Sequence, residues 1–117
     1  MVVKENAKDG DSVSIKAYNG SDPIVVIPEQ IDGKDVISII NGSFSNDSLK
    51  YVDLGYNLKE FDNAYFSDTL EVIHLPAGVE NLDKVVFFGE DTLTIVGKAG
   101  SFAETFAKEE GIKFEAE

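Results

Sequence analysis

His74 is the only histidine in the sequence, and Asp53 precedes it by 21 residues. The two residues hold equivalent positions in a repeated pattern, so parallel neighbouring strands would place their side chains on one face. A carboxylate that orients an imidazole can make it a general base. The equivalent positions on the adjacent strands carry no suitable nucleophile. An enzyme that uses His74 and Asp53 is therefore the weakest of our functional hypotheses, and we assign no catalytic residue.

Three aspartates in turn segments, Asp47, Asp68 and Asp91, raise the question of a calcium site. Their spacing does not match an EF-hand loop, and one carboxylate per turn supplies too few oxygen ligands for Ca²⁺. The sequence has no cysteine, which excludes disulfide bonds and thiolate metal sites. We therefore predict solvated turns at these positions, with no metal ion and no cofactor.

The elements that would position His74 and Asp53 belong to a repeat. Residues 49–54, LKYVDL, return 21 residues later as residues 70–75, LEVIHL. The apolar positions that follow return at the same step: Leu58, Phe61 and Phe66 become Val79, Leu82 and Phe87. A period in the low twenties carrying L-x-x-[VI]-x-L is typical of leucine-rich repeats, in which a short strand leads into a looser return segment. Phe44 extends the aromatic position to an earlier repeat, so we expect three stacked phenylalanines.

An earlier strand at residues 24–28, IVVIP, and a later one beginning at Leu93 extend the pattern. Because strand side chains alternate between faces, the residues between the repeated apolar positions should point away from the core. Alignment on the leucines predicts two outward columns. The first, an apolar column, contains Ile24, Tyr51, Val72 and Ile95, and the second contains Val26, Asp53, His74 and Gly97.

The apolar column would form a continuous exposed ridge, and such a ridge often marks a partner site. We therefore predict a binding surface made of Ile24, Val26, Tyr51, Asp53, Val72, His74 and Ile95. The alternative is that β-branched and aromatic residues favour strands wherever they point, and that the N-terminal segment folds over the ridge. Substantial exposure of Tyr51 and Val72 would favour binding, and burial of both under residues 1–20 would remove the hypothesis.

The N-terminal region is predicted to form a cap on the repeats. Residues 13–18, VSIKAY, alternate apolar with polar and predict a half-buried strand, whereas the first ten residues should be loosely held. The first repeat then carries five additional residues, DGKDV at 32–36. Gly33 suits a tight turn with positive φ, so we predict a small β-excursion there, with Val36 returning to the core.

The C-terminal region is predicted to form a second cap. Ser101 and Glu104 form an S-x-x-E capping box before apolar residues at helical spacing, and Glu104 and Lys108 form an i,i+4 pair. Gly111 can end this helix in the left-handed conformation, and residues 112–114 alternate as a short final strand.

These elements predict an α/β, mostly β fold: a right-handed leucine-rich-repeat solenoid of short parallel strands with a strand-rich N-terminal cap and a C-terminal capping helix. The chain is predicted to be a single leucine-rich-repeat domain, residues 1–117. Residues 1–23 form the N-terminal cap, residues 24–96 the repeats and residues 97–117 the C-terminal cap.

The residues resemble the BspA-like leucine-rich repeats of bacterial surface proteins. The similar segments are residues 26–28 with Ile31, residues 31–36, residues 74–76 with Val79, and the ending at residues 97–114. The family's usual Ala-Phe pair appears here as Ser-Phe, Tyr-Phe and Val-Phe, and Gly55 replaces the proline after the second repeat strand. The resemblance implies a secreted or cell-surface protein used for adhesion to proteins or host surfaces, and it carries over no catalytic residue.

The net charge of −12 opposes binding to nucleic acid or to anionic lipid surfaces. No apolar run is long enough to insert into a membrane. The function we predict is an extracellular or cell-surface protein-binding module of the adhesion type, acting as a monomer on a protein partner such as a host or matrix protein. The main alternative is a structural spacer in a larger surface protein.

Overall fold

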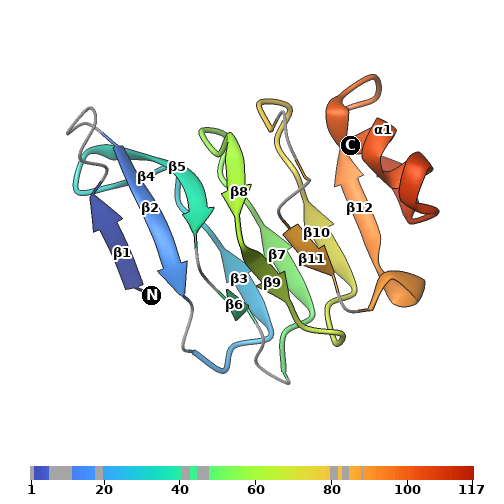
Figure 1. Cartoon of the computed structure of the whole chain (residues 1–117), viewed down its shortest axis with the longest axis horizontal. Coiled ribbons are helices and arrows are strands. Elements are labelled where there is room, and N and C mark those ends of the chain that lie inside the picture. The colour runs from blue at the N-terminus through green and yellow to red at the C-terminus, as the bar shows by residue number, and fades with distance from the viewer. Residues whose placement is uncertain are drawn as a thin grey trace.

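The computed structural model describes residues 2–5, 12–17, 20–40, 43–44, 48–79, 82, 85–87 and 89–117. These residues form a mostly β structure with three sheets and one C-terminal α-helix. Figure 1 shows the strands running side by side along the molecule, with α1 at the end opposite β2. The prediction of a mostly β fold with short parallel strands and a C-terminal helix is confirmed.

The central element is a five-stranded sheet in which every pairing is parallel, and we call it the parallel sheet. Its order is β13-β12-β10-β7-β3. The strands are β3 Ile24–Val26, β7 Tyr51–Asp53, β10 Val72–His74, β12 Thr94–Gly97 and β13 Lys113–Ala116. The 21-residue repeat therefore places β10 next to β7, and the other strands of the sheet follow in chain order on either side.

One side of the parallel sheet faces the core. The central residues Val25, Val52, Ile73 and Ile95 are aligned across the strands and buried. The buried apolar residues that follow the first three strands are Ile27, Leu54 and Leu75. Burying each of these side chains contributes about 1.5–3 kcal/mol relative to exposure. This inward row is the part of the sheet that the repeat specifies most strongly.

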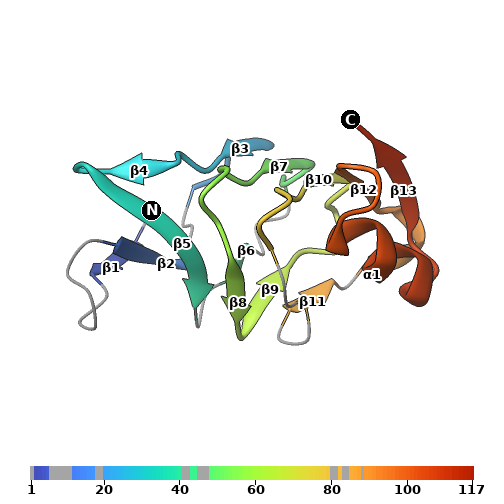
Figure 2. The same cartoon turned by 90° about the horizontal axis from the view of Figure 1, so that it is seen from above.

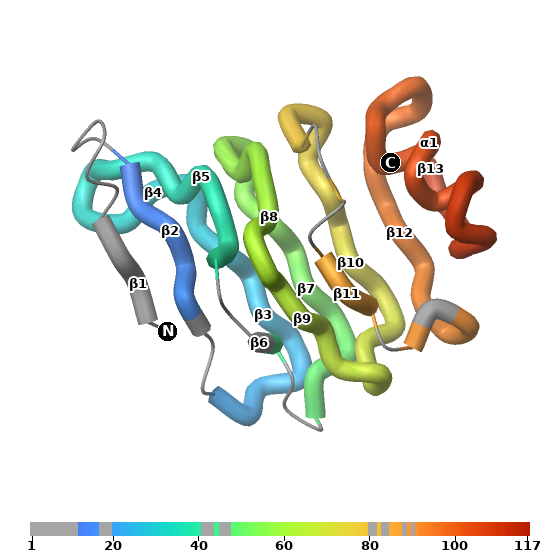
Figure 3. The backbone as a smooth tube through the Cα atoms, viewed as in Figure 1, coloured from blue at the N-terminus to red at the C-terminus, as the bar shows by residue number. Residues whose placement is uncertain are grey.

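Two further sheets lie mainly in the opposite layer, although β4 lies level with β3 (Figure 2). The first has the order β1-β2-β5-β4, with β8 also paired to β5. Its strands are β1 Val2–Glu5, β2 Ser12–Ala17, β4 Gln30–Ile31, β5 Lys34–Ile40 and β8 Glu60–Asp62. The second, a three-stranded parallel sheet, contains β6 Ser43–Phe44, β9 Ala64–Phe66 and β11 Val85–Phe87. The chain alternates between the two layers, and the core lies between them (Figure 3).

The N-terminal segment is more ordered than its composition suggests. Of the strand predicted at residues 13–18, residues 13–17 belong to β2, which pairs with β5 in parallel, and residue 18 lies outside the described residues. Val2–Glu5 forms β1, antiparallel to β2, so the expectation of a loosely held start was wrong for residues 2–5. An edge strand has unpaired backbone N–H and C=O groups, and an extended neighbouring segment can pair with them. Amino-acid composition does not reveal this kind of pairing.

The predicted β-excursion is confirmed as a hairpin between β4 and β5. Asp32 and Gly33 occupy its tip with φ of 52° and 77°. Two successive left-handed residues are what a two-residue type I′ hairpin requires. Val36 is 1% exposed and returns to the core as expected.

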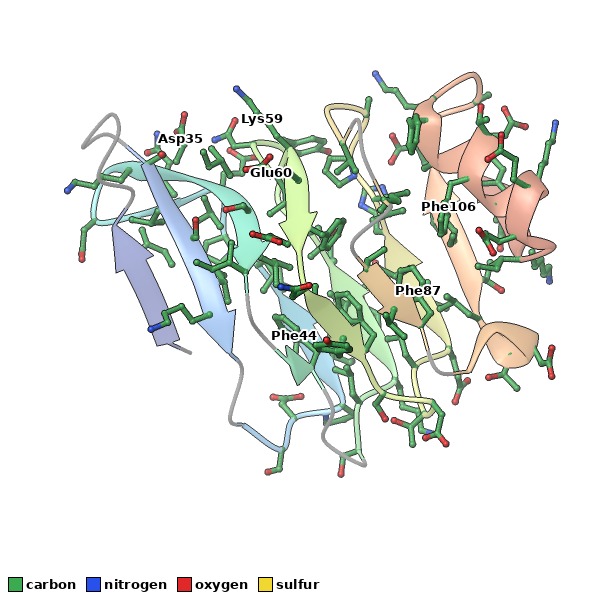
Figure 4. All side chains as sticks on the ribbon, viewed as in Figure 1. Asp35, Phe44, Lys59, Glu60, Phe87 and Phe106 are labelled. Atoms are coloured by element: carbon green, nitrogen blue, oxygen red, sulfur yellow. The ribbon has the colours of Figure 1, made fainter. Side chains whose placement is uncertain are left out.

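The predicted aromatic column is also confirmed. The ring centroids of Phe44 and Phe66 are 5.2 Å apart, and those of Phe66 and Phe87 are 5.3 Å apart. Phe106 of the helix continues the series, 6.3 Å from Phe87, and Figure 4 labels Phe44, Phe87 and Phe106. Offset stacking of this kind contributes about 0.5–1.5 kcal/mol per pair beyond burial.

The C-terminal region contains a short 3₁₀ helix, η1 Glu90–Thr92, and the α-helix α1 Phe102–Glu110. Gly111 closes α1 with φ of 71°, and Glu104 pairs with Lys108 at 3.3 Å, both as predicted. The predicted capping box does not form. The Glu104 side chain accepts a hydrogen bond from the N–H of Gly100 and not from that of the N-cap Ser101, and the Ser101 hydroxyl donates to the Lys98 carbonyl.

The final strand, predicted at residues 112–114, forms as β13 and pairs in parallel with β12. The helix α1 is thus the connection between two neighbouring parallel strands. Its buried residues Ala103 and Ala107 face the core, which closes that end of the molecule.

Candidate functional site

The outward side of the parallel sheet carries the first predicted column only in part. Ile24, Tyr51 and Val72 are aligned as expected, but the residue of β12 opposite Val72 is Thr94. Ile95, predicted as the fourth member, is 0% exposed and points into the core. The apolar row therefore has three members in the described structure and continues into Thr94 and Lys113.

The physical reason for this correction is a one-residue shift in the last strand. Three positions separate Leu49 from Val52, whereas only two separate Leu93 from Ile95. Alignment on the leucine therefore displaces β12 by one residue, and in a strand a displacement of one residue exchanges the two faces. The backbone confirms the true register, because the Leu75 N–H donates to the Val96 carbonyl just as the Leu54 N–H donates to that of His74.

The second column contains Val26, Asp53 and His74 as predicted, and its next member is Val96, not Gly97. Gly97 is buried, and a Cβ at this position would lie 3.2 Å from both the Ala103 Cβ and the Leu75 carbonyl oxygen. Glycine at this position therefore lets α1 approach the sheet, which is a packing role and not a surface role.

On the outward face, side chains are more exposed on the edge strand β3 than on the neighbouring strands β7 and β10. Ile24 is 59% and Val26 61% exposed, whereas Tyr51 and Val72 are half-buried. Burial, followed by the negative charge of Asp53, raises the pKa of the Tyr51 hydroxyl. The described N-terminal strands β1 and β2 belong to the opposite layer, so they do not cover this face.

His74 lies between two carboxylates on the outward face. Its Nδ1 is 2.9 Å from Asp53 Oδ1, and its Nε2 contacts Glu117 Oε2. The Glu117 N–H also donates to the Gly97 carbonyl, which holds this residue against the sheet. We call His74, Asp53 and Glu117 the histidine clasp. The predicted His74–Asp53 pair is thus present, and Glu117 is a partner that the sequence pattern did not indicate.

The clasp favours the imidazolium form of His74. Burial alone would lower the His74 pKa, but hydrogen bonds to Glu117 and Asp53, together with their negative charges, outweigh burial and raise it. A general base needs a ring nitrogen with a free lone pair. In this arrangement both ring nitrogens already contact carboxylates, so neither is free to accept a proton from a substrate.

A hollow of about 230 Å³ lies beside the clasp, where the chain leaves β3 and β7. The residues that line it include Val26, Pro28, Glu29, Asp53, Gly55, Tyr56 and His74. Pro28, Gly55 and Tyr56 were not among the predicted site residues. One departure from the repeat pattern in the sequence marks this place: Gly55 follows its strand at the position where Pro28 and Pro76 follow the equivalent strands.

Gly55 shapes this hollow by permitting close approach of two loops. A Cβ on Gly55 would lie 3.0 Å from the carbonyl oxygens of Ile27 and Pro28. The Asn57 side-chain amide then donates to the Glu29 carbonyl and to Asp35 Oδ1, each at 3.2 Å. The loop after β7 is therefore anchored to the loop after β3 and to the β4–β5 hairpin.

The acidic turn residues were considered as calcium ligands, and the structure describes two of the three. Asp68 and Asp91 are exposed, and Asp47 lies outside the described residues. No group of three or more His, Asp or Glu side chains suited to a metal ion occurs in the described part of the chain. In the same residues, the only α-helix is nine residues long, and no helix is long and apolar enough to cross a membrane.

No protein-family model, curated protein or solved structure matches this chain.

Proposed function

We propose that this protein is a secreted or cell-surface binding module that recognises a protein partner through the outward face of the parallel sheet. We further propose that its fold is a right-handed leucine-rich-repeat solenoid of the BspA-like type. The 21-residue step between β7 and β10, their parallel pairing and the stacked phenylalanines support this assignment.

The observation that carries the proposal is the apolar row of Ile24, which is exposed, and Tyr51 and Val72, which are half-buried; none of the described strands of the opposite layer covers it. Core formation accounts for Val25, Val52 and Ile73 on the other side of the same strands, but it does not account for apolar residues facing water. Val26, in the second column, adds to the apolar surface at the β3 end. An apolar patch framed by polar residues is the usual composition of a protein interface.

The chemistry of this face favours a protein over other partner classes. The net charge of −12 would repel nucleic acid. The histidine clasp leaves no free imidazole nitrogen for acid–base chemistry, and the proposal therefore includes no catalytic role. A face with one aromatic residue, Tyr51, in the middle of its apolar row suits a side-chain contact from another protein.

The test is to measure binding of purified extracellular-matrix and cell-surface proteins to the wild type and to Tyr51→Lys by biolayer interferometry. We expect Tyr51→Lys to weaken binding about tenfold or more, as for loss of a central interface residue. The matched control is Tyr65→Lys, which places the same substitution on β9 in the opposite layer, at a residue that is 41% exposed.

Circular dichroism melts would establish that both variants fold. If Tyr51→Lys binds as tightly as Tyr65→Lys and the wild type, the outward face is not the binding surface. That result would favour the structural-spacer alternative, because a spacer tolerates charge on either layer.

A further inference from the structure

The hollow beside the histidine clasp has the size of one side chain. Its volume is about 230 Å³, below the about 300–1,000 Å³ of pockets that hold cofactors and drug-sized ligands. It opens on the outward face at the carboxyl ends of β3 and β7, next to the proposed binding surface. A partner lying on that surface could therefore place a single side chain into it.

The walls of the hollow are apolar and unusually exposed. Tyr56 is 70% exposed and Val26 61%, the two largest exposures among the large apolar side chains of the described residues. Pro28 adds a third apolar wall. The face of a tyrosine ring attracts a cation, and an aliphatic surface accommodates the methylene stem that carries one.

Two carboxylates, those of Asp53 and Glu29, line the hollow. Asp53 uses Oδ1 to accept from His74, while its Oδ2 has no hydrogen-bond partner among the described residues. Glu29 also borders the hollow, and its carboxylate forms no ion pair within the described part of the chain. No lysine lines the hollow, and His74 already lies between two carboxylates. A cationic group would complement this charge.

We propose that the hollow receives an arginine side chain of the protein partner. The guanidinium would donate to Asp53 Oδ2 while stacking on Tyr56, and its stem would lie on Val26. Arginine suits this geometry better than lysine because its planar fork can donate and stack at once. This inference rests on the proposed protein-binding function and names the chemistry of the partner.

The experiment is a titration of ¹⁵N-labelled protein, followed by NMR, with three capped tripeptides: acetyl-Gly-Arg-Gly-amide and its lysine and glutamine counterparts. We expect saturable shifts at the amides of Val26, Gly55 and Tyr56 with the arginine peptide, at a Kd of about 1 mM, as for a single weak contact. The lysine peptide should bind more weakly, and the neutral glutamine peptide should leave these amides unshifted.

Two variants and a matched control locate the contact. Asp53→Asn keeps an oxygen that can accept from His74 Nδ1 but removes the charge, and we expect arginine-peptide binding to weaken about fivefold. Tyr56→Ala removes the stacking surface and should have a similar effect. Glu71→Gln removes the same charge from the residue that precedes β10, in a side chain paired with Lys50 outside the hollow, and should change binding little.

Equal weakening by Asp53→Asn and Glu71→Gln would overturn the proposal, since the peptide would then sense only the overall negative charge. Equal shifts with the arginine and glutamine peptides would overturn it as well. The result is separable from the proposed function. If a partner is lost in Tyr51→Lys but the peptide shifts no amide of the hollow, the arginine site fails and the binding face stands. If the peptide binds in the hollow but Tyr51→Lys retains its partner, the hollow binds arginine and the proposed binding face fails.

Discussion

The two sides of the parallel sheet follow different rules although they share the same strands. The inward residues Val52, Ile73 and Ile95 are all 0% exposed and all β-branched. The outward residues change along the sheet, from Ile24 on β3, which is 59% exposed, to Lys113 on β13. The inward side is constrained by packing and is therefore repetitive. The outward side is free to vary, and it holds the individual features of this protein.

The largest difference in stability between the two sides is expected for a pair of lysine substitutions on β12. Ile95→Lys would bury an unpaired ammonium, and we expect it to cost more than about 4 kcal/mol of unfolding free energy. Val96→Lys places the same charge on the outward side and should cost about 1 kcal/mol or less. Urea unfolding of both variants measures the difference. Similar losses for the two variants would contradict the register of β12.

A second pair compares neighbours on β10. Ile73→Ala removes core contacts and leaves a cavity, so we expect a loss of about 2–5 kcal/mol. Val72→Ala removes methyl groups from a half-buried outward position and should cost about 1 kcal/mol. Both values come from chemical denaturation monitored by circular dichroism. If Val72→Ala proved as costly as Ile73→Ala, the outward side would be part of the core and not an available binding face.

The smallest expected effect concerns the histidine clasp. The folded pKa of His74 is raised above its ordinary value of 6.5, so its stabilisation is fully present below about pH 6.5. This stabilisation is lost as the pH rises through the folded pKa. It should amount to about 1 kcal/mol or less, because both carboxylates are partly solvated.

An NMR titration of the His74 ring measures the folded pKa directly, and Glu117→Gln should lower it by removing one carboxylate. The stability difference between the wild type and His74→Gln should shrink as the pH increases through that value. A ring titration at or below 6.5 in the wild type would show that the two carboxylates do not hold the imidazolium form.

Much of the inward architecture could be predicted from the sequence. The 21-residue step identified the strands β7 and β10, Gly33 located the hairpin tip, and Phe44, Phe66 and Phe87 stack as expected. These features depend on local geometry: the alternation of a strand, a positive φ, and a constant rise from one repeat to the next. Each is expressed by residue types within a short window.

The prediction failed where a local sequence pattern and a contact with another segment favour different structures. Leu93 resembles the leading leucine of a repeat, yet the chain between it and Ile95 is one residue shorter, and pairing with β10 sets the register. Ser101 has the right spacing for a helix cap, but its hydroxyl bonds to the nearby Lys98 carbonyl. In both cases a plausible local pattern competes with a contact that the sequence window does not contain.

The sequence by itself determined the inward residues of β3, β7 and β10, the positions of these parallel strands and the C-terminal helix, because apolar residues recur there at the spacing of buried positions. The tertiary structure decided the outward residues of β12, where Thr94 and Val96 stand in place of the predicted Ile95 and Gly97. It brought Glu117 to His74 across 43 residues of chain, and it placed Gly55 against the loop after β3 to form the hollow. Such contacts arise from packing between distant segments, and so no local pattern encodes them.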